Sequence, residues 1–330
     1  MNDLSPEPNQ TWWNRASGSF PPLRFIDTLL RGIGQVMFQD NPLSGLFFFV
    51  AIGWGAYAAG APEVAVGGAL AVVVATLTAH WLRVDGAALR AGLFGFNAYL
   101  VGIALPTFLS PSPVLWAYIL LGAALTVVVT LATSRVMQTW GAPALTAPFV
   151  LIAWLLLLSS NGFSGLEGGG LPTSGLIQPI AAEAANPLQP LDFIAGLWIS
   201  ISQVFVKADG IAALLILIGL AVGSLAAAGY ALAAALISVV VAHLLGAESQ
   251  LITGGLVGFN PILTAIALCT VFYRPSLRSA VYALLGTIIT VLVQGAMVAA
   301  VTPFAIPTLT AAFVIITWLF LLAKPARLGD

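Results

Sequence analysis

Charged residues are scarce in this sequence. Of its 330 residues, 11 are Lys or Arg and 12 are Asp or Glu, so charged side chains make up 7% of the chain, whereas an average soluble domain has about 25%. So few charges cannot cover the surface of a soluble protein of this length. Hydrophobic side chains make up 60% of the chain, which predicts a protein that crosses a lipid bilayer several times.

Cysteine is nearly absent as well. The single cysteine, Cys269, excludes a disulfide framework and any metal site built from several cysteines. The formal net charge of −1 provides no positive field that would hold nucleic acid. The chain contains no G-x-x-x-x-G-K-[ST] motif, which excludes a phosphate-binding loop of its own. We therefore expect no cofactor, no metal and no nucleic-acid partner.

Most of the hydrophobic residues fall into apolar runs. A helix that crosses the bilayer needs about 20 mainly apolar residues, and the composition allows roughly ten such helices. The runs lie near 42–60, 64–82, 88–108, 114–133 and 144–160, and then near 211–228, 230–245, 251–272, 279–299 and 308–323. Two amphipathic segments, 23–38 and 193–206, are too short to cross the bilayer alone.

The positive charges predict the orientation in the membrane. When successive loops are assigned alternately to the two sides, ten of the eleven Lys and Arg residues fall on the side that holds both termini. Lys207 alone falls elsewhere. Because cytoplasmic loops are enriched in Lys and Arg, the sequence predicts that both termini are cytoplasmic.

The two halves of the sequence resemble each other. The segment 92–97 (GLFGFN) returns as 255–260 (GLVGFN), and 145–150 (LTAPFV) returns as 309–314 (LTAAFV). At nearly the same spacing, the pairs His80 and His243, Trp154 and Trp318, and Gln35-Val36 and Gln203-Val204 also match. Each half holds five runs, and this odd number makes the second half enter from the opposite side. The sequence predicts an all-α polytopic membrane protein of two inverted repeats, each with five transmembrane helices and one re-entrant half-helix.

This pattern divides the chain into five parts. They are a cytoplasmic N-terminal segment (1–22), the first repeat (23–160), an extracytoplasmic linker (161–192), the second repeat (193–324) and a cytoplasmic C-terminus (325–330). Folds with inverted repeats place the solute path near the midplane, often at broken helices. The two short segments hold corresponding positions and are the candidates for re-entrant half-helices, which are tolerated where their ends line a cavity.

Gln35 and Gln203 lie near the ends of these two segments. A half-helix leaves its last carbonyl groups unpaired and carries partial negative charge at that end, and glutamine adds a side-chain oxygen. A single buried glutamine could equally well cap a helix or bond to a neighbouring helix as accept a hydrogen bond from a solute. The matched pair favours acceptors for a solute with N–H groups.

Matched hydrophobic residues predict a narrow slot. Phe96 and Leu100 lie four residues apart on one helix face, as do Phe259 and Leu263. Such pairs usually serve helix packing, but their repetition about a pseudo-two-fold axis favours opposed walls around a flat solute.

Two matched pairs of polar residues allow alternative interpretations. Thr146 and Thr310 open the fifth run of each half, and their hydroxyl groups either bond back to the preceding turn or form the polar centre of a constriction. For His80 and His243 we favour buried or interfacial positions rather than a role in a proton relay, because neither histidine has an acidic residue at the spacing that a relay needs. No run carries a central cluster of charges of the kind that binds ions, so the pathway suits an uncharged solute that moves down its gradient.

Two longer motifs resemble those of a known family. The segment 35–46 (QVMFQDNPLSGL) closely resembles the first-half signature of urea transporters, and 92–102 (GLFGFNAYLVG) is similar to the third-helix motif of that family. The resemblance implies a homotrimer in the plasma (inner) membrane, with one channel-like pore in each protomer that passes urea passively. It also implies that the protein is not an enzyme.

The same resemblance implies roles for individual residues. Gln35 and Gln203, with the half-helix carbonyl groups, would form two ladders of oxygens that accept hydrogen bonds from urea. The slots would be formed by Phe38, Phe96 and Phe259, their walls by Leu100, Val204 and Leu263, and the middle site by Thr146 and Thr310. The second half departs from the first after its half-helix, where 209–213 (DGIAA) replaces 41–45 (NPLSG). Some relatives have glutamate where Gln203 stands.

Two alternatives remain open. One is a channel for another small neutral solute, such as ammonia, a short amide, water or glycerol. Asn41-Pro42 and Asn260-Pro261 echo the paired Asn-Pro motifs of water channels, although they hold non-equivalent places in the repeats. The other is a membrane-embedded enzyme, which would need a nucleophile and base or metal ligands within the bilayer, and two histidines with one cysteine offer little for that chemistry.

Overall fold

The computed structural model describes residues 12–176 and 188–324, and every regular element in these two ranges is a helix. This confirms the predicted all-α class. Three parts of the predicted division lie outside the described residues: the first half of the N-terminal segment (1–11), residues 177–187 of the linker and the C-terminal segment (325–330). In the described part of the linker, Glu167 and Gly169 bond to the chain at the end of the helix Phe96–Phe108: Ser110 N donates to Glu167 O (2.8 Å), and Gly169 N donates to Phe108 O (3.0 Å).

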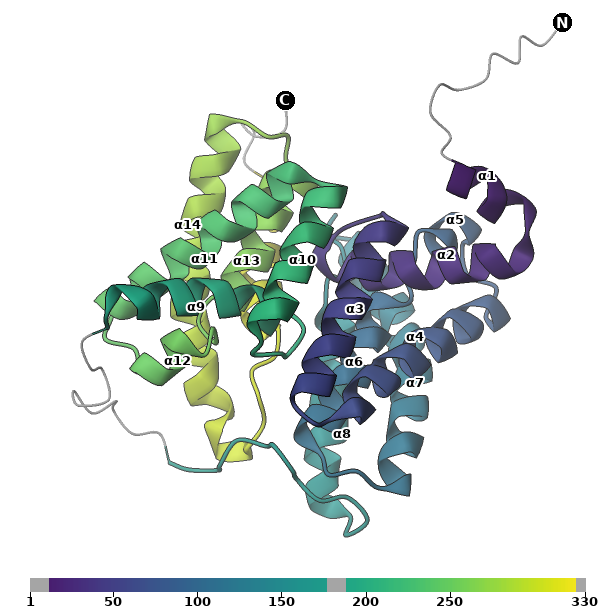
Figure 1. Cartoon of the computed structure of the whole chain (residues 1–330), viewed down its shortest axis with the longest axis horizontal. Coiled ribbons are helices and arrows are strands. Elements are labelled where there is room, and N and C mark those ends of the chain that lie inside the picture. Colours follow the sequence, from purple (N-terminus) through teal and green to yellow (C-terminus); the bar gives the residue numbers. More distant parts are fainter. Residues whose placement is uncertain (1–11, 177–187, 325–330) are drawn as a thin grey trace, which may run out of the picture.

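The helices fall into two series that follow the predicted halves (Figure 1). The first series is α1 (Trp12–Ser19), α2 (Pro21–Gly34), η1 (Gln35–Met37), α3 (Pro42–Ala58), α4 (Pro62–Trp81), α5 (Gly86–Arg90), α6 (Phe96–Phe108), α7 (Pro113–Gln138), α8 (Ala147–Ser159) and η2 (Ser160–Gly162). The second series is α9 (Pro190–Gln203), α10 (Gly210–Gly223), α11 (Leu225–Leu244), α12 (Ser249–Thr253), α13 (Phe259–Ile266), the π-helix η4 (Ala267–Val271), α14 (Leu277–Val301), η5 (Thr302–Phe304) and α15 (Ala311–Leu322). Helices α2 to α8 correspond in order to α9 to α15.

The chain turns at the same places in both series. Phe38 and Val206 have φ values of +61° and +57°, and Leu145 and Leu309 have values of +53° and +50°. Residues other than glycine rarely adopt this left-handed conformation, so its occurrence at matched positions shows that the sequence repeat extends to the backbone.

The ten apolar runs differ in the length of the helices that they contain. Among the described residues, four helices are long and apolar enough to cross a bilayer: α4, α7, α11 and α14 with η5. Helices α2 and α3 are bent by 76° at the break between them, as in a broken span or a re-entrant loop. The other apolar runs contain shorter helices of 10–17 residues, which are α6, α8 with η2, α10, α13 with η4, and α15.

Close crossings of helices explain two of these short helices. Gly92, with φ +75°, precedes α6, and a Cβ atom there would lie 2.2 Å from the backbone N of Gly32 in α2. Gly255, with φ +70°, precedes α13, and a Cβ atom there would lie 2.5 Å from the N of Ser200 in α9. The predicted runs 88–108 and 251–272 are therefore broken where the two candidate half-helices pass against them.

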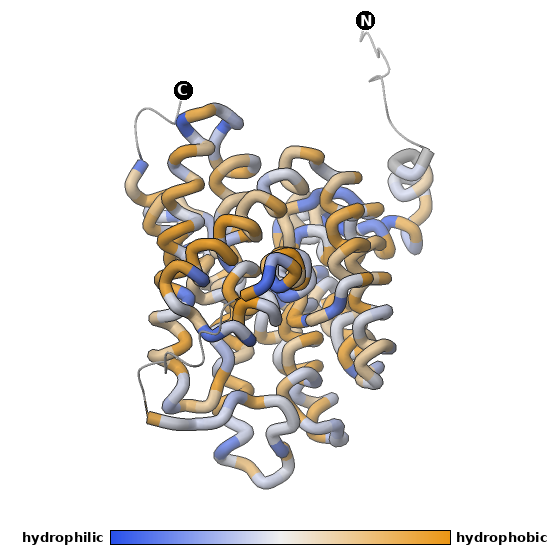
Figure 2. Tube along the Cα trace, turned by 60° about the vertical axis from the view of Figure 1, so that its left-hand side comes forward, coloured by the Kyte–Doolittle hydropathy of each residue, from blue (hydrophilic) through white to orange (hydrophobic). Residues whose placement is uncertain are grey.

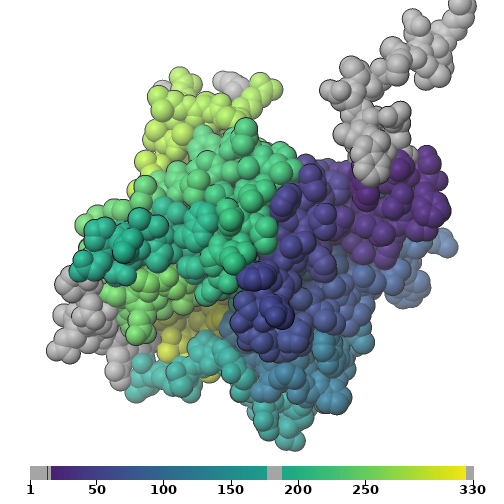
Figure 3. All heavy atoms as spheres, viewed as in Figure 1, coloured from purple at the N-terminus to yellow at the C-terminus, as the bar shows by residue number. Residues whose placement is uncertain are grey.

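The two halves share one hydrophobic core. Helix α3 packs along α10, and Figure 3 shows the dark-blue atoms of the first half against the green atoms of the second half. A Cβ atom on Gly219 of α10 would lie 2.7 Å from the ring of Phe48 in α3. Figure 2 shows hydrophobic residues along the helices on both sides of the molecule, as expected for surfaces that face lipid. His80 and His243 are exposed in the last turns of α4 and α11, in agreement with the interfacial interpretation.

Candidate pore between the two halves

The C-terminal end of each half-helix reaches the opposite half. The ring of Phe38, which follows η1, lies edge-on to Phe313 of α15 and to Phe272, which follows η4, with centroid separations of 6.1 Å in both cases. Phe205, which follows α9, contacts Phe48 of α3 at 5.3 Å and Tyr99 of α6 at 6.4 Å. The ends of α2 and α9 therefore lie at the interface between the repeats.

Both half-helices end in the same backbone turn. After α2, Phe38 N donates to Gln35 O (3.0 Å) and Gln39 N donates to Gly34 O (3.0 Å). After α9, Val206 N donates to Gln203 O (2.9 Å) and Lys207 N donates to Ser202 O (3.3 Å). The left-handed residue reverses the chain, as is common at helix C-termini, and it leaves the carbonyl end of each helix facing the interface.

The two glutamines have the same fixed orientation. Gln35 Nε2 donates to the carbonyl of Ala91 (2.9 Å), and Gln203 Nε2 donates to the carbonyl of Gly254 (2.8 Å). Since only the amide nitrogen can donate to a carbonyl, this bond determines which way each amide points. Neither Oε1 accepts a hydrogen bond from a described residue, so each half-buried glutamine retains an acceptor.

The two threonines meet where the halves join. Thr146 and Thr310 precede α8 and α15 as N-cap residues, and their hydroxyl oxygens are 2.6 Å apart. Both residues are buried, with 3% exposure. The hydroxyl groups thus bond to each other rather than to their own helices, which favours the constriction over the helix-bonding alternative. The N-terminal ends of α8 and α15, which carry partial positive charge, converge on this pair.

Two asparagines, whose role the sequence analysis did not predict, hold the turns before these threonines. Asn97 Nδ2 donates to Leu145 O (3.2 Å), and its Oδ1 accepts from Phe149 N (3.3 Å). Asn260 makes the same pair of bonds, to Leu309 O (3.0 Å) and from Phe313 N (3.1 Å). Both asparagines lie in the repeated GLxGFN segment, so the repeat could have identified them as a matched pair.

The predicted slot residues lie in or against one core that extends through both halves. Leu100, Val204, Phe259 and Leu263 are buried in it, and the half-buried Phe38 and Phe96 pack against it. Phe272 and Phe313, which contact Phe38, were not predicted. No ring contact joins Phe96 to Phe259 among the described residues, so the predicted opposition of these two rings is not observed as a direct pair.

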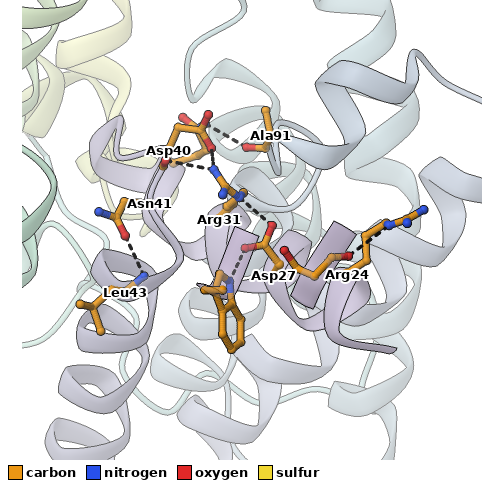
Figure 4. A network of polar contacts seen from close by, with 10 residues as sticks. Arg24, Asp27, Arg31, Asp40, Asn41, Leu43 and Ala91 are labelled. Carbon is orange, nitrogen blue, oxygen red and sulfur yellow. Dashed lines mark hydrogen bonds and ion pairs between the residues drawn. The ribbon is translucent and has the colours of Figure 1, made fainter. Parts of the chain in front are cut away.

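A cleft opens beside the first glutamine. It has a volume of about 370 Å³, and its lining includes Asp27, Arg31, Asp40 and Ala91. Arg31 bonds to the carboxylates of Asp27 and Asp40, at 2.7 Å each (Figure 4). Since Ala91 accepts the hydrogen bond of Gln35, this ion-paired cleft lies next to the end of the first half-helix. Arg24 and Arg90 also line the cleft, so its three guanidinium groups and two carboxylates give a net charge of +1.

A sequence model of a protein family described as Urea transporter matches residues 26–325. The chain belongs to the urea transporter family. Relatives named Urea transporter 1 from Ovis aries and Mus musculus are 27% and 28% identical over 303 residues, which is 91% of this chain and 77% of each relative. The resemblance inferred from two motifs is thereby confirmed along nearly the whole chain, and the match includes most of α2, all of α9 and the threonine pair of this urea transporter family member.

Proposed function

We propose that this protein conducts urea passively across the membrane, through a narrow pore between its two halves. The observation that carries the proposal is the matched pair of glutamines. Each ends a half-helix at the interface between the repeats, and each is held by a bond from Nε2, so that its oxygen is left to accept hydrogen bonds. A protein that only needed capped helices would not require an unused acceptor at both ends.

The chemistry of urea matches such a path. Urea has four N–H hydrogens and one carbonyl oxygen, and a buried donor without a partner costs roughly 1–3 kcal/mol. A pore must therefore replace the lost water by acceptors, without binding so tightly that exit becomes slow. The half-helix carbonyl groups, with Gln35 and Gln203, supply fixed and uncharged oxygens on either side of the threonine pair.

The threonines provide the middle site in this proposal. Their hydroxyl groups can both donate and accept, so urea exchanges the bond between Thr146 and Thr310 for bonds to itself as it passes. On either side, Phe38, Phe96 and Phe259, with Leu100, Val204 and Leu263, select a flat solute by shape. The proposal also includes a homotrimer in the plasma (inner) membrane, with both termini in the cytoplasm and the second repeat inverted relative to the first.

Purified protein in liposomes tests the proposed solute. We expect stopped-flow light scattering to report much faster equilibration of urea than of glycerol, with formamide and thiourea as analogues that keep two N–H groups or the planar shape. Faster flux of ammonia, water or glycerol than of urea would instead assign the pore to another small neutral solute.

A further inference from the structure

Lys207 occupies the position after the left-handed residue of the second half-helix end, and at this position the two ends differ in charge. It directly follows the left-handed Val206, as Gln39 follows Phe38. The backbone N of Lys207 donates to Ser202 O and that of Gln39 donates to Gly34 O, so both residues lie against the last turn of their half-helix. The first half places a neutral amide at this position, and the second half places a cation there.

Lys207 is buried and extends toward the other half. Its exposed fraction is 7%, although lysine is almost never fully buried unless it is paired. A Cβ atom on Gly55 of α3 would lie 3.4 Å from Lys207 Cδ and 3.5 Å from Cγ, so the stem of Lys207 packs against the first half. The ion pairs of the described residues join Arg31 to Asp27 and Asp40, and none of them includes Lys207.

A cation is favourable at this end of a helix, because the C-terminus of α9 carries partial negative charge. The same negative charge creates a problem for a urea pore. Two half-helix ends with free carbonyl oxygens attract cations as well as neutral N–H donors, since rings of carbonyl groups are also used to bind ions.

We propose that Lys207 is a specificity-determining residue that excludes cations from the pore, a proposal that rests on the proposed function in urea conduction. Guanidinium is the informative cation, because it is planar and close to urea in size and offers N–H donors on all three nitrogens. Its N–H donors and its shape would therefore suit the oxygens and the slot, and it differs from urea in its charge and in having an NH2 group in place of the carbonyl oxygen. A buried positive charge repels guanidinium strongly and leaves neutral urea nearly unaffected.

The test compares two fluxes in the same proteoliposomes, of radiolabelled guanidinium and of radiolabelled urea. The variants are Lys207→Gln, which copies the first half, Lys207→Met, which keeps an unbranched stem without charge, and Lys207→Arg, which keeps the charge. Lys324→Gln is the matched control, because it removes one positive charge from an exposed lysine. We expect the guanidinium-to-urea flux ratio to rise at least tenfold in Lys207→Gln and Lys207→Met, which corresponds to about 1.4 kcal/mol in the barrier.

The ratio should stay at the parental value in Lys207→Arg and Lys324→Gln. An unchanged ratio in Lys207→Gln and Lys207→Met would overturn the proposal, as would an equal rise in Lys324→Gln. Loss of urea flux in both neutral variants would also overturn it, because Lys207 would then be needed for the pore itself rather than for selection. Absence of urea flux in the parental protein would instead contradict the proposed function.

Discussion

At the scale of single residues, the repeat identified the paired positions but could not assign their partners. Gln35 and Gln203, and Thr146 and Thr310, were predicted from their matched places in the two halves. The bonds of both amides to carbonyl groups about 50 residues away depend on tertiary structure and leave no local sequence pattern. For the same reason the role of Asn97 and Asn260 was not predicted, although they lie inside a recognised repeat.

Replacement of Gln35 by leucine tests the acceptor role. Gln35→Leu has similar volume but leaves urea donors unmet, so the barrier should rise by at least 1.4 kcal/mol, or about tenfold in rate. Gln35→Glu should retain much of the flux, because its oxygens still accept. Urea flux in liposomes gives the comparison, and parental flux in Gln35→Leu would remove this residue from the oxygen ladder.

The threonine pair predicts non-additive stability. Thr146→Val or Thr310→Val leaves the other buried hydroxyl without its partner, at a cost of roughly 1–3 kcal/mol. The double variant removes both polar groups, so its melting temperature in detergent should fall by less than the sum of the single changes. Thr139→Val serves as the control, since that hydroxyl is exposed and bonds within its own helix. Strictly additive changes would mean that the hydroxyl groups do not depend on each other.

At the scale of helices, the sequence predicted where apolar segments lie but not where they are interrupted. The left-handed residues Leu145 and Leu309 are themselves apolar, so hydropathy continues across the breaks before α8 and α15. The short amphipathic segments were recognised as half-helices because they are too short to cross the bilayer alone. Their crossing with the turns at Gly92 and Gly255 was not predicted, since it joins elements far apart in the sequence.

Gly92→Ala should distort the crossing of α2 with the turn before α6. A non-glycine residue at φ +75° is strained by about 1–3 kcal/mol, and its Cβ atom would also meet the backbone of Gly32. The melting temperature and urea flux should both fall. Gly53→Ala is the matched control, because nothing lies within 4 Å of that position and alanine favours a helix by about 0.5–1 kcal/mol. Equal stability of the two variants would show that the crossing tolerates a side chain.

At the scale of the whole molecule, reciprocal contacts join the two halves. Trp154 Nε1 donates to Pro307 O, and Trp318 Nε1 donates to Pro143 O, at 2.8 Å each. In each half, the threonine of the pair Thr146 and Thr310 lies in the sequence between the proline and the tryptophan that make these contacts. The repeat in the sequence predicted a two-fold relation between the halves, but it could not predict that the tryptophans would bond across the interface.

The central claim is that urea passes down its gradient through one pore between the halves. Purified protein in sealed liposomes tests it most directly, by measuring radiolabelled urea in both directions with and without a protonophore and with sodium replaced. We expect equal permeability coefficients for entry and exit, no effect of either treatment, and a final internal concentration equal to the external one. Accumulation of urea above the external concentration, or flux no faster than in protein-free liposomes, would contradict the claim.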